Sequence, residues 1–277
     1  MARTVELTTP DNAIAQLNRV NQTVVGELRR INKIVLADYR KLLRTTRTDD
    51  IDAGNLDDYV QSLVARYGQW FAKNEDTLAR SIELVEKTAR AGNAVRFNAK
   101  MRQALNRKGQ AVVYPDLSII AEEGISKRTS RAWQFEQLDL IKKDGSVGPN
   151  GVPSIPQKHF ERLQEIVQRS VHGGDSWEDL RAQLVELDGV DERRAEVIAR
   201  DQTNKYNAGM TQERSKSLGI THYIWRTVGD DSVRDEHRAR NGRRFAYDDP
   251  PRDGPPGVPV QCRCYADPDF DEALSRR

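Results

Sequence analysis

The chain has 277 residues, which is enough for one large domain or two ordinary ones. Hydrophobic residues make up 37% of it and charged residues 31%, a composition typical of elongated helices that bury one stripe and expose the rest. The net charge of +2 gives no general reason to expect nucleic-acid binding, so an electrostatic case has to rest on local patches.

The sequence shows no feature of export. The first ten residues lack the apolar run of a secretion signal, and no stretch approaches the ~20 apolar residues that a membrane span needs. The two cysteines give no disulfide framework. We therefore expect synthesis in a reducing cytoplasm and no contact with a membrane.

Apolar spacing predicts that the first half of the chain is helical. Apolar residues recur at steps of three and four over residues 12–43, after Asp11 as a candidate N-cap. The same periodicity predicts a second helix over 56–74 and a third that starts near Leu78 and continues toward Leu105. A further helix is expected around Trp133.

Residues 143–153 are dominated by glycine, proline and asparagine, which predicts a linker. We place the domain boundary there. The prediction is a helical N-terminal domain over residues 1–145 and a C-terminal module over residues 146–277.

The C-terminal module begins with predicted helices. A helix over residues 156–171 should end at Gly173-Gly174, where glycine suits a left-handed cap. Ser176 and Asp179 have the spacing of a capping box before the next helix. A third helix is expected from about Asp191 to Gly219.

The pattern then changes to short strands. Residues 222–227 alternate between apolar and polar, and residues 245–247 and 260–265 resemble further strands, with a short helix or turn over 232–240. The expected fold class is mainly α with a small C-terminal α+β module: a helical N-terminal domain, then helices and a short antiparallel sheet.

Cys262 and Cys264 are separated by one residue and follow His237 by about 25 residues. Alternate residues of a strand project to one face, so both sulfurs could face a single zinc ion with His237 as third ligand. His222, Asp231 or Asp235 are candidates for a fourth ligand. The alternatives are two small thiols packed in the sheet, or a thiolate nucleophile with His237 as its base.

A basic segment gives the local argument for DNA. No Asp or Glu occurs between Lys87 and Tyr114, and such basic runs attract phosphates without reading sequence. The alternatives are a solvated helix face or a surface for an acidic protein partner. The candidate contact residues are Arg90, Arg96, Lys100, Arg102, Arg107 and Lys108.

An ordered series of residues from 199 to 268 resembles a known family. It opens with the polar stretch Ala199-Arg200-Asp201-Gln202-Thr203-Asn204, passes through a Trp225-Arg226 strand, and closes with Pro255-Pro256-Gly257 and Cys262-Arg263-Cys264. This series is similar to the C-terminal module of phage head morphogenesis proteins, the family named for protein F of phage Mu and also called minor head or minor capsid proteins. One departure is Arg200-Asp201-Gln202-Thr203, where many relatives have Arg-Thr-Glu.

The resemblance implies a structural minor head protein of a tailed phage or prophage. Such a protein is made in the host cytoplasm and ends in the virion head. The implied partners are the portal protein, inner capsid or scaffold proteins, and packaged double-stranded DNA. Only a few residues follow the module, so no toxin domain of the kind that some relatives carry is expected.

The resemblance assigns no catalytic residue, and we expect the matching positions to stabilise the small β-rich module. These positions are Arg226, Asp231, Arg234, His237, Gly242, Gly257, Cys262 and Cys264. Two alternative functions stay open at this point. One is a zinc- or thiol-dependent hydrolase that uses His237, Cys262 and Cys264, and the other is a non-specific DNA-binding protein.

Overall fold

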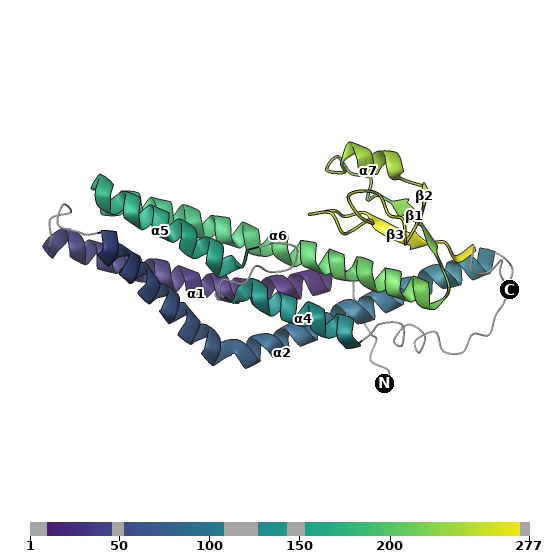
Figure 1. Cartoon of the computed structure of the whole chain (residues 1–277), viewed down its shortest axis with the longest axis horizontal. Helices are drawn as coiled ribbons and strands as arrows, with labels where there is room; N and C mark the ends of the chain where they lie inside the picture. Colours follow the sequence, from purple (N-terminus) through teal and green to yellow (C-terminus); the bar gives the residue numbers. More distant parts are fainter. Residues whose placement is uncertain (1–9, 46–52, 108–126, 143–152, 272–277) are drawn as a thin grey trace, which may run out of the picture. The chain divides into compact units, whose positions relative to one another are not determined.

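A computed structural model describes residues 10–45, 53–107, 127–142 and 153–271. Over these ranges the protein is mainly helical, with a small three-stranded antiparallel sheet near its C-terminal end (Figure 1). This confirms the fold class predicted from the sequence. Among the described helices, none combines the length and apolarity that crossing a membrane requires.

The helices of the described ranges are α1 (Pro10–Thr45), α2 (Ala53–Arg107), α4 (Lys127–Ile141), α5 (Ile155–Gly173), α6 (Trp177–Ser217) and α7 (Asp235–Arg240).

Two predicted breaks between helices were wrong. The segments 56–74 and 78–105 form one continuous helix, α2, and the two helices expected between Ser176 and Gly219 are likewise the single helix α6. Neither helix contains proline, which would remove a backbone hydrogen bond. A glycine inside a helix costs only about 1 kcal/mol relative to alanine, so Gly92 and Gly189 do not stop these helices.

The predicted helix ends around residue 174 are confirmed. Gly174 caps α5 in the left-handed conformation, with φ of 67°, and its N–H donates to the carbonyl of Ser170. The Ser176 hydroxyl accepts from the Asp179 N–H, and the Asp179 carboxylate accepts in return from Ser176. This reciprocal pair is the capping box that starts α6.

The chain divides into two compact units, and each is assembled from separate segments. Unit 1 comprises Met1–Leu17, Leu84–Trp133 and Ala199–Arg277, and unit 2 comprises Asn18–Glu83 and Gln134–Ile198. Each unit thus uses parts of both predicted domains. The boundary at residue 145 stays a prediction, and residues 143–152 of its linker lie outside the described residues.

Unit 2 is helical and is held by buried polar contacts as well as by its apolar core. The Tyr67 hydroxyl of α2 donates to the carbonyl of Ile141, and the Tyr67 ring meets Phe160 of α5 edge-on at 6.0 Å. In the same unit, His159 of α5 contacts the Asp191 carboxylate of α6 at 2.7 Å, with both side chains buried. These contacts satisfy polar groups that would be costly to bury alone.

In unit 1, α2 and α6 meet along a polar seam. Glu86 of α2 is buried, and its carboxylate accepts hydrogen bonds from the hydroxyls of Ser130 and Tyr206. Burial, reinforced by the bond to Glu86, raises the pKa of Tyr206. Trp133 stacks on the Tyr206 ring at 4.9 Å, which closes this end of the seam.

Farther along the seam lies a buried arginine. Arg214 of α6 is 1% exposed and donates to the side-chain oxygen of Asn93 in α2, and burial lowers the pKa of Arg214 to about 10. Asn93 in turn donates to the Asn207 carbonyl at 3.1 Å and to the Thr211 hydroxyl at 3.0 Å. Each of these groups has a partner on the other helix, so the seam fixes one register of α2 against α6.

The sheet of unit 1 consists of β1 (His222–Arg226), β2 (Arg244–Ala246) and β3 (Tyr265–Pro268) in the order β2-β1-β3. Both pairings of β1 are antiparallel. The predicted strand over 260–265 was wrong, because residues 260–264 form a turn and an irregular segment that lead into β3. Proline at 259 and the left-handed backbone of Gln261, with φ of 56°, keep this stretch out of the ladder.

One face of the sheet forms a buried aromatic core. Tyr223 and Trp225 alternate along β1 and are fully buried, and they pack with Tyr247 and the two cysteines. These aromatic side chains therefore form the core of the module. Figure 1 shows the strands and α7 gathered beside the C-terminal part of α6.

A second apolar cluster ties the chain after β3 to α2 within unit 1. Phe270 and Phe97 meet edge-on at 5.4 Å, and Met101, Leu105 and Ile220 complete the cluster. Both phenylalanine rings are buried. Aromatic pairs of this geometry add to the free energy gained by burial alone.

Replacing Phe270 with alanine should destabilise unit 1 by about 3–5 kcal/mol, as truncation of a buried phenylalanine does. The matched control is Phe135→Ala, because Phe135 is 65% exposed, and a change of less than about 0.5 kcal/mol is expected there. Chemical denaturation followed by circular dichroism measures both changes. Equal effects of the two substitutions would contradict the role given to the Phe97–Phe270 pair.

Candidate functional site

The structure brings His237, Cys262 and Cys264 together in unit 1. The Nδ1 atom of His237 lies 3.5 Å from the Cys262 sulfur and 3.6 Å from the Cys264 sulfur. All three potential ligand atoms lie within 4.8 Å of one another. Cys262 is 3% exposed and Cys264 is 6% exposed, so both cysteines are buried.

The other ring nitrogen of His237 is held by a carboxylate. Nε2 lies 2.8 Å from Asp253 Oδ2, and Arg240 Nη1 lies 2.6 Å from the other oxygen of Asp253. Burial alone would raise the pKa of the Asp253 carboxyl, but the hydrogen bonds from His237 and Arg240 outweigh it and keep that pKa below its usual range. Since Nε2 donates to the carboxylate in neutral His237, Nδ1 presents a lone pair to the two sulfurs.

The pKa values of the two thiols shift in opposite directions. Hydrogen bonding from Cys264 lowers the pKa of Cys262, because it stabilises the Cys262 thiolate. The same bond raises the pKa of Cys264, which has to keep its proton to make it.

The aromatic core covers the cluster. The His237 ring meets Trp225 of β1 edge-on at 5.1 Å, and the Arg240 guanidinium lies over the same indole at 5.2 Å. Trp225 has no exposed surface. The imidazole is therefore fixed by packing on one side and by Asp253 on the other.

Helix α6 anchors the loop that carries the cysteines. The Asp201 carboxylate accepts from the Gln261 backbone N–H at 2.8 Å, and Asn204 donates to the Cys262 carbonyl at 3.4 Å. Gly257 has φ of 90°, and a Cβ there would lie 3.1 Å from the Cβ of Ala208 in α6. Only glycine gives the loop both this backbone conformation and this close approach.

The remaining positions of the series serve the fold of the module. Arg226 lies 3.4 Å from the Asp267 carboxylate across the β1–β3 pair, and Arg234 donates to the Val260 carbonyl at 2.7 Å. Gly242 turns the chain with φ of 81°, and its N–H donates to the Trp225 carbonyl. Asp231 is exposed and stands apart from the cluster.

The expected fourth ligands do not join the cluster. Among the described residues, the group of potential ligands contains only the histidine and the two cysteines. His222 Nδ1 lies 2.8 Å from the Thr221 hydroxyl, and Asp235 is exposed on α7.

Two residues that matter here were not found from the sequence. Asp253 lies in a proline- and glycine-rich loop, sixteen residues after His237, and nothing in that spacing predicts their contact. Asp201 was noted only as a departure from the relatives. The one sequence feature that pointed to Asp201 was its place in the polar stretch that opens the family-like series.

Several side chains of the basic segment already have partners within unit 1. Arg96 is partly buried, donates to the Asn207 side chain at 3.0 Å, and has a pKa lowered by burial. Arg90 lies 3.4 Å from Glu86, and Lys100 lies 3.6 Å from Asp267. Arg102 is exposed. The Arg107 side chain and Lys108 lie outside the described residues.

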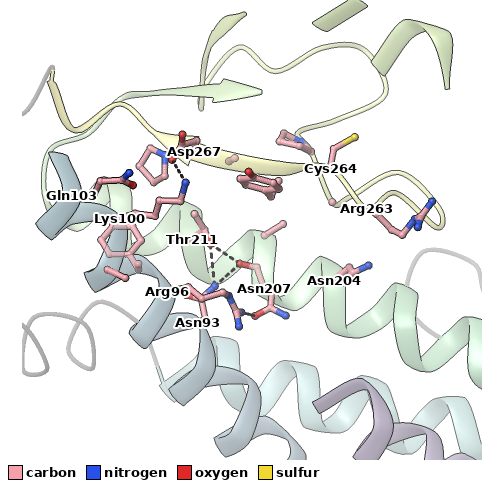
Figure 2. A pocket seen from close by; sticks show the side chains of 18 residues that line it. Asn93, Arg96, Lys100, Gln103, Asn204, Asn207, Thr211, Arg263, Cys264 and Asp267 are labelled. Atoms are coloured by element: carbon pink, nitrogen blue, oxygen red, sulfur yellow. Dashed lines mark hydrogen bonds and ion pairs between the residues drawn. The ribbon is translucent and has the colours of Figure 1, made fainter. Parts of the chain in front are cut away.

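Two cavities flank the β-rich module in unit 1. The smaller, of about 420 Å³, is lined by the thiol–histidine cluster together with the side chains of Arg200, Arg234 and Arg263. The larger, of about 610 Å³, lies between α2, α6 and β3. Figure 2 shows its polar lining, contributed by Asn93, Arg96, Lys100, Asn207, Thr211 and Asp267.

The cluster lies inside a region that matches a known family. Residues 161–266 match the family described as Phage Mu protein F like protein. We call residues 161–266 the Mu F-like region. The Mu F-like region starts within α5 and ends in β3, so it contains the cluster, its anchors on α6 and Asp253.

A relative of the chain is a protein of Haemophilus influenzae (strain Rd), called "Uncharacterized protein". It is 37% identical over 121 residues, which are 43% of this chain and 27% of the relative. The chain thus spans about a quarter of that relative's length. No solved structure matches the chain.

A substitution in the Mu F-like region tests the anchoring of the cysteine loop. Gly257→Ala should destabilise unit 1 by more than about 1 kcal/mol, because alanine is strained at this φ and meets Ala208. The control is Gly209→Ala in α6, where a Cβ meets no atom within 4 Å and should be neutral or stabilising. Thermal unfolding of the two variants measures the difference, and a neutral Gly257→Ala would refute the close approach.

Proposed function

We propose that the protein is a structural minor head protein that acts in the head morphogenesis of a tailed phage or prophage. The observation that carries this proposal is the match of residues 161–266 to the Phage Mu protein F-like family. The matched region contains α6, β1, α7, β2 and the buried His237–Cys262–Cys264 cluster, together with parts of α5 and β3. Its location would be the virion head, after synthesis in the host cytoplasm.

The chemistry of the matched residues supports a structural role. Asp201, Gly257 and Asn204 position a loop, and Arg226 and Arg234 bridge neighbouring segments of the module. Each of these contacts stabilises the fold of the module. A head protein needs such a rigid module to present one surface repeatedly to its neighbours.

The proposed partners are the portal protein and inner capsid or scaffold proteins, with packaged double-stranded DNA as a further contact. Fewer of the candidate residues are available to DNA than the sequence indicated. Arg90, Arg96 and Lys100 already have acidic or polar partners within unit 1. Among the described candidate contact residues, Arg102 is exposed and is available to a phosphate. Protein–protein contact is therefore the main proposed activity.

A second candidate is a thiol-dependent hydrolase. One observation favours it: His237 lies between the thiols and the Asp253 carboxylate, as the base of a cysteine nucleophile would. Against it, both sulfurs are more than nine-tenths buried and Trp225 packs over the imidazole.

Alkylation separates the two candidates. In the structural account, iodoacetamide should modify Cys262 and Cys264 only when the native protein unfolds, because both sulfurs are buried. Mass spectrometry of peptides from native and denaturant-treated protein measures the modification. Rapid modification of Cys262 in the native protein would favour the hydrolase.

The proposed location is tested in purified particles. Mass spectrometry of density-purified procapsids and mature heads should detect this protein at a constant ratio to the portal protein. An abundant host protein, followed through the same gradient, controls for contamination. Absence of the chain from both kinds of particle would overturn the proposal.

A further inference from the structure

We propose that His237, Cys262 and Cys264 bind one zinc ion, with Asp253 orienting the histidine and the fourth coordination position open to the smaller cavity. This site goes beyond the proposed role in the phage head and does not depend on it. It is carried by the geometry of the three ligand atoms, by the group that holds the histidine, and by the charge of the ligand set.

The distances match tetrahedral zinc. Zinc binds histidine nitrogen at about 2.0–2.1 Å and cysteine sulfur at about 2.3 Å, so the nitrogen–sulfur edge of the tetrahedron is about 3.6 Å. The two observed distances from His237 Nδ1 to the sulfurs are 3.5 and 3.6 Å. Both nitrogen–sulfur edges therefore have the length that a tetrahedral zinc ion requires.

Thiol packing alone explains this arrangement poorly. In neutral His237, Nδ1 has a single lone pair and can accept a hydrogen bond from only one S–H group. Yet Cys262 and Cys264 approach it at nearly equal distances. A zinc ion uses the nitrogen lone pair and both sulfurs at once.

The second nitrogen of His237 has the partner that zinc-binding histidines usually have. A ligating histidine commonly donates its other ring N–H to a carboxylate, which fixes the ring and strengthens its basicity. Asp253 occupies that position at 2.8 Å and is itself held by Arg240 at 2.6 Å. The arrangement is thus a carboxylate–histidine pair directed at the two sulfurs.

Charge also favours a dication. Two thiolates and a neutral imidazole carry a charge of minus two, which zinc cancels, so the occupied site is neutral as burial requires. Thiolate and imidazole ligands together select zinc over magnesium or calcium. The arginines that line the cavity, Arg200, Arg234 and Arg263, would favour a water, hydroxide or anion as the fourth ligand.

Zinc binding would crosslink the module. His237 lies on α7, and the two cysteines lie in the segment before β3, so the ion would join parts of the chain that are 25 and 27 residues apart. Because an unfolded chain has no such site, the binding free energy would add to the stability of the folded module.

Elemental analysis of the full-length protein, purified without chelator, should find one zinc ion per chain. Cobalt(II) added to the stripped protein should give the near-ultraviolet thiolate charge-transfer band and the visible bands of tetrahedral cobalt. Zinc should also raise the Tm of the stripped protein. Background metal content together with the absence of cobalt–thiolate bands would overturn the proposal.

Variants assign the ligands. Cys262→Ser, Cys264→Ser and His237→Gln should each lose the bound ion, and Asp253→Asn should weaken zinc affinity by roughly 10–100-fold. The control is His222→Gln, which removes a histidine outside the cluster and should bind zinc as the wild type does. If the ligand variants fail to fold, the wild type still decides: zinc titrated into the stripped protein should bind at one ion per chain in isothermal titration calorimetry, and the absence of saturable binding would refute the site.

Discussion

The attachment of the cysteine loop to helix α6 is the constraint on which the rest of the site depends. Residues 249–264 contain little regular structure, so few backbone hydrogen bonds of a ladder or helix fix them. Their position comes instead from the Asp201 carboxylate on the Gln261 N–H, and from the contact of Gly257 with Ala208. With the loop held there, the two sulfurs lie 3.5 and 3.6 Å from His237 Nδ1.

The scaffold under this loop is itself fixed by polar contacts. Glu86, Asn93 and Arg214 are buried between α2 and α6, and a buried polar group without its partner would cost about 1–3 kcal/mol. A shift of one helix along the other would break several of these bonds together. The seam therefore fixes α6 in one register against α2. Because the cysteine loop is attached to α6, the loop and the cluster it carries are held in place as well.

Sequence reasoning succeeded where local rules decide the outcome. Period and capping residues predicted α1, the Ser176–Asp179 box and the strand after Gly219, because each depends on neighbouring residues. It failed where distant parts of the chain meet. The Asp253–His237 contact and the burial of Arg96 arise from tertiary packing, and the continuity of α2 and α6 reflects neighbours that compensate for weak local helix propensity.

The central claim is that the cluster and its anchors hold the β-rich module on a stable α2–α6 scaffold. Hydrogen exchange measured by mass spectrometry, in the wild type and in the Asp201→Ala variant, tests it most directly. The account predicts faster exchange in residues 227–264 of the variant, while the seam residues of α2 and α6 keep their protection. Unchanged exchange in the loops, or equal loss of protection in the loops and along the seam, would contradict it.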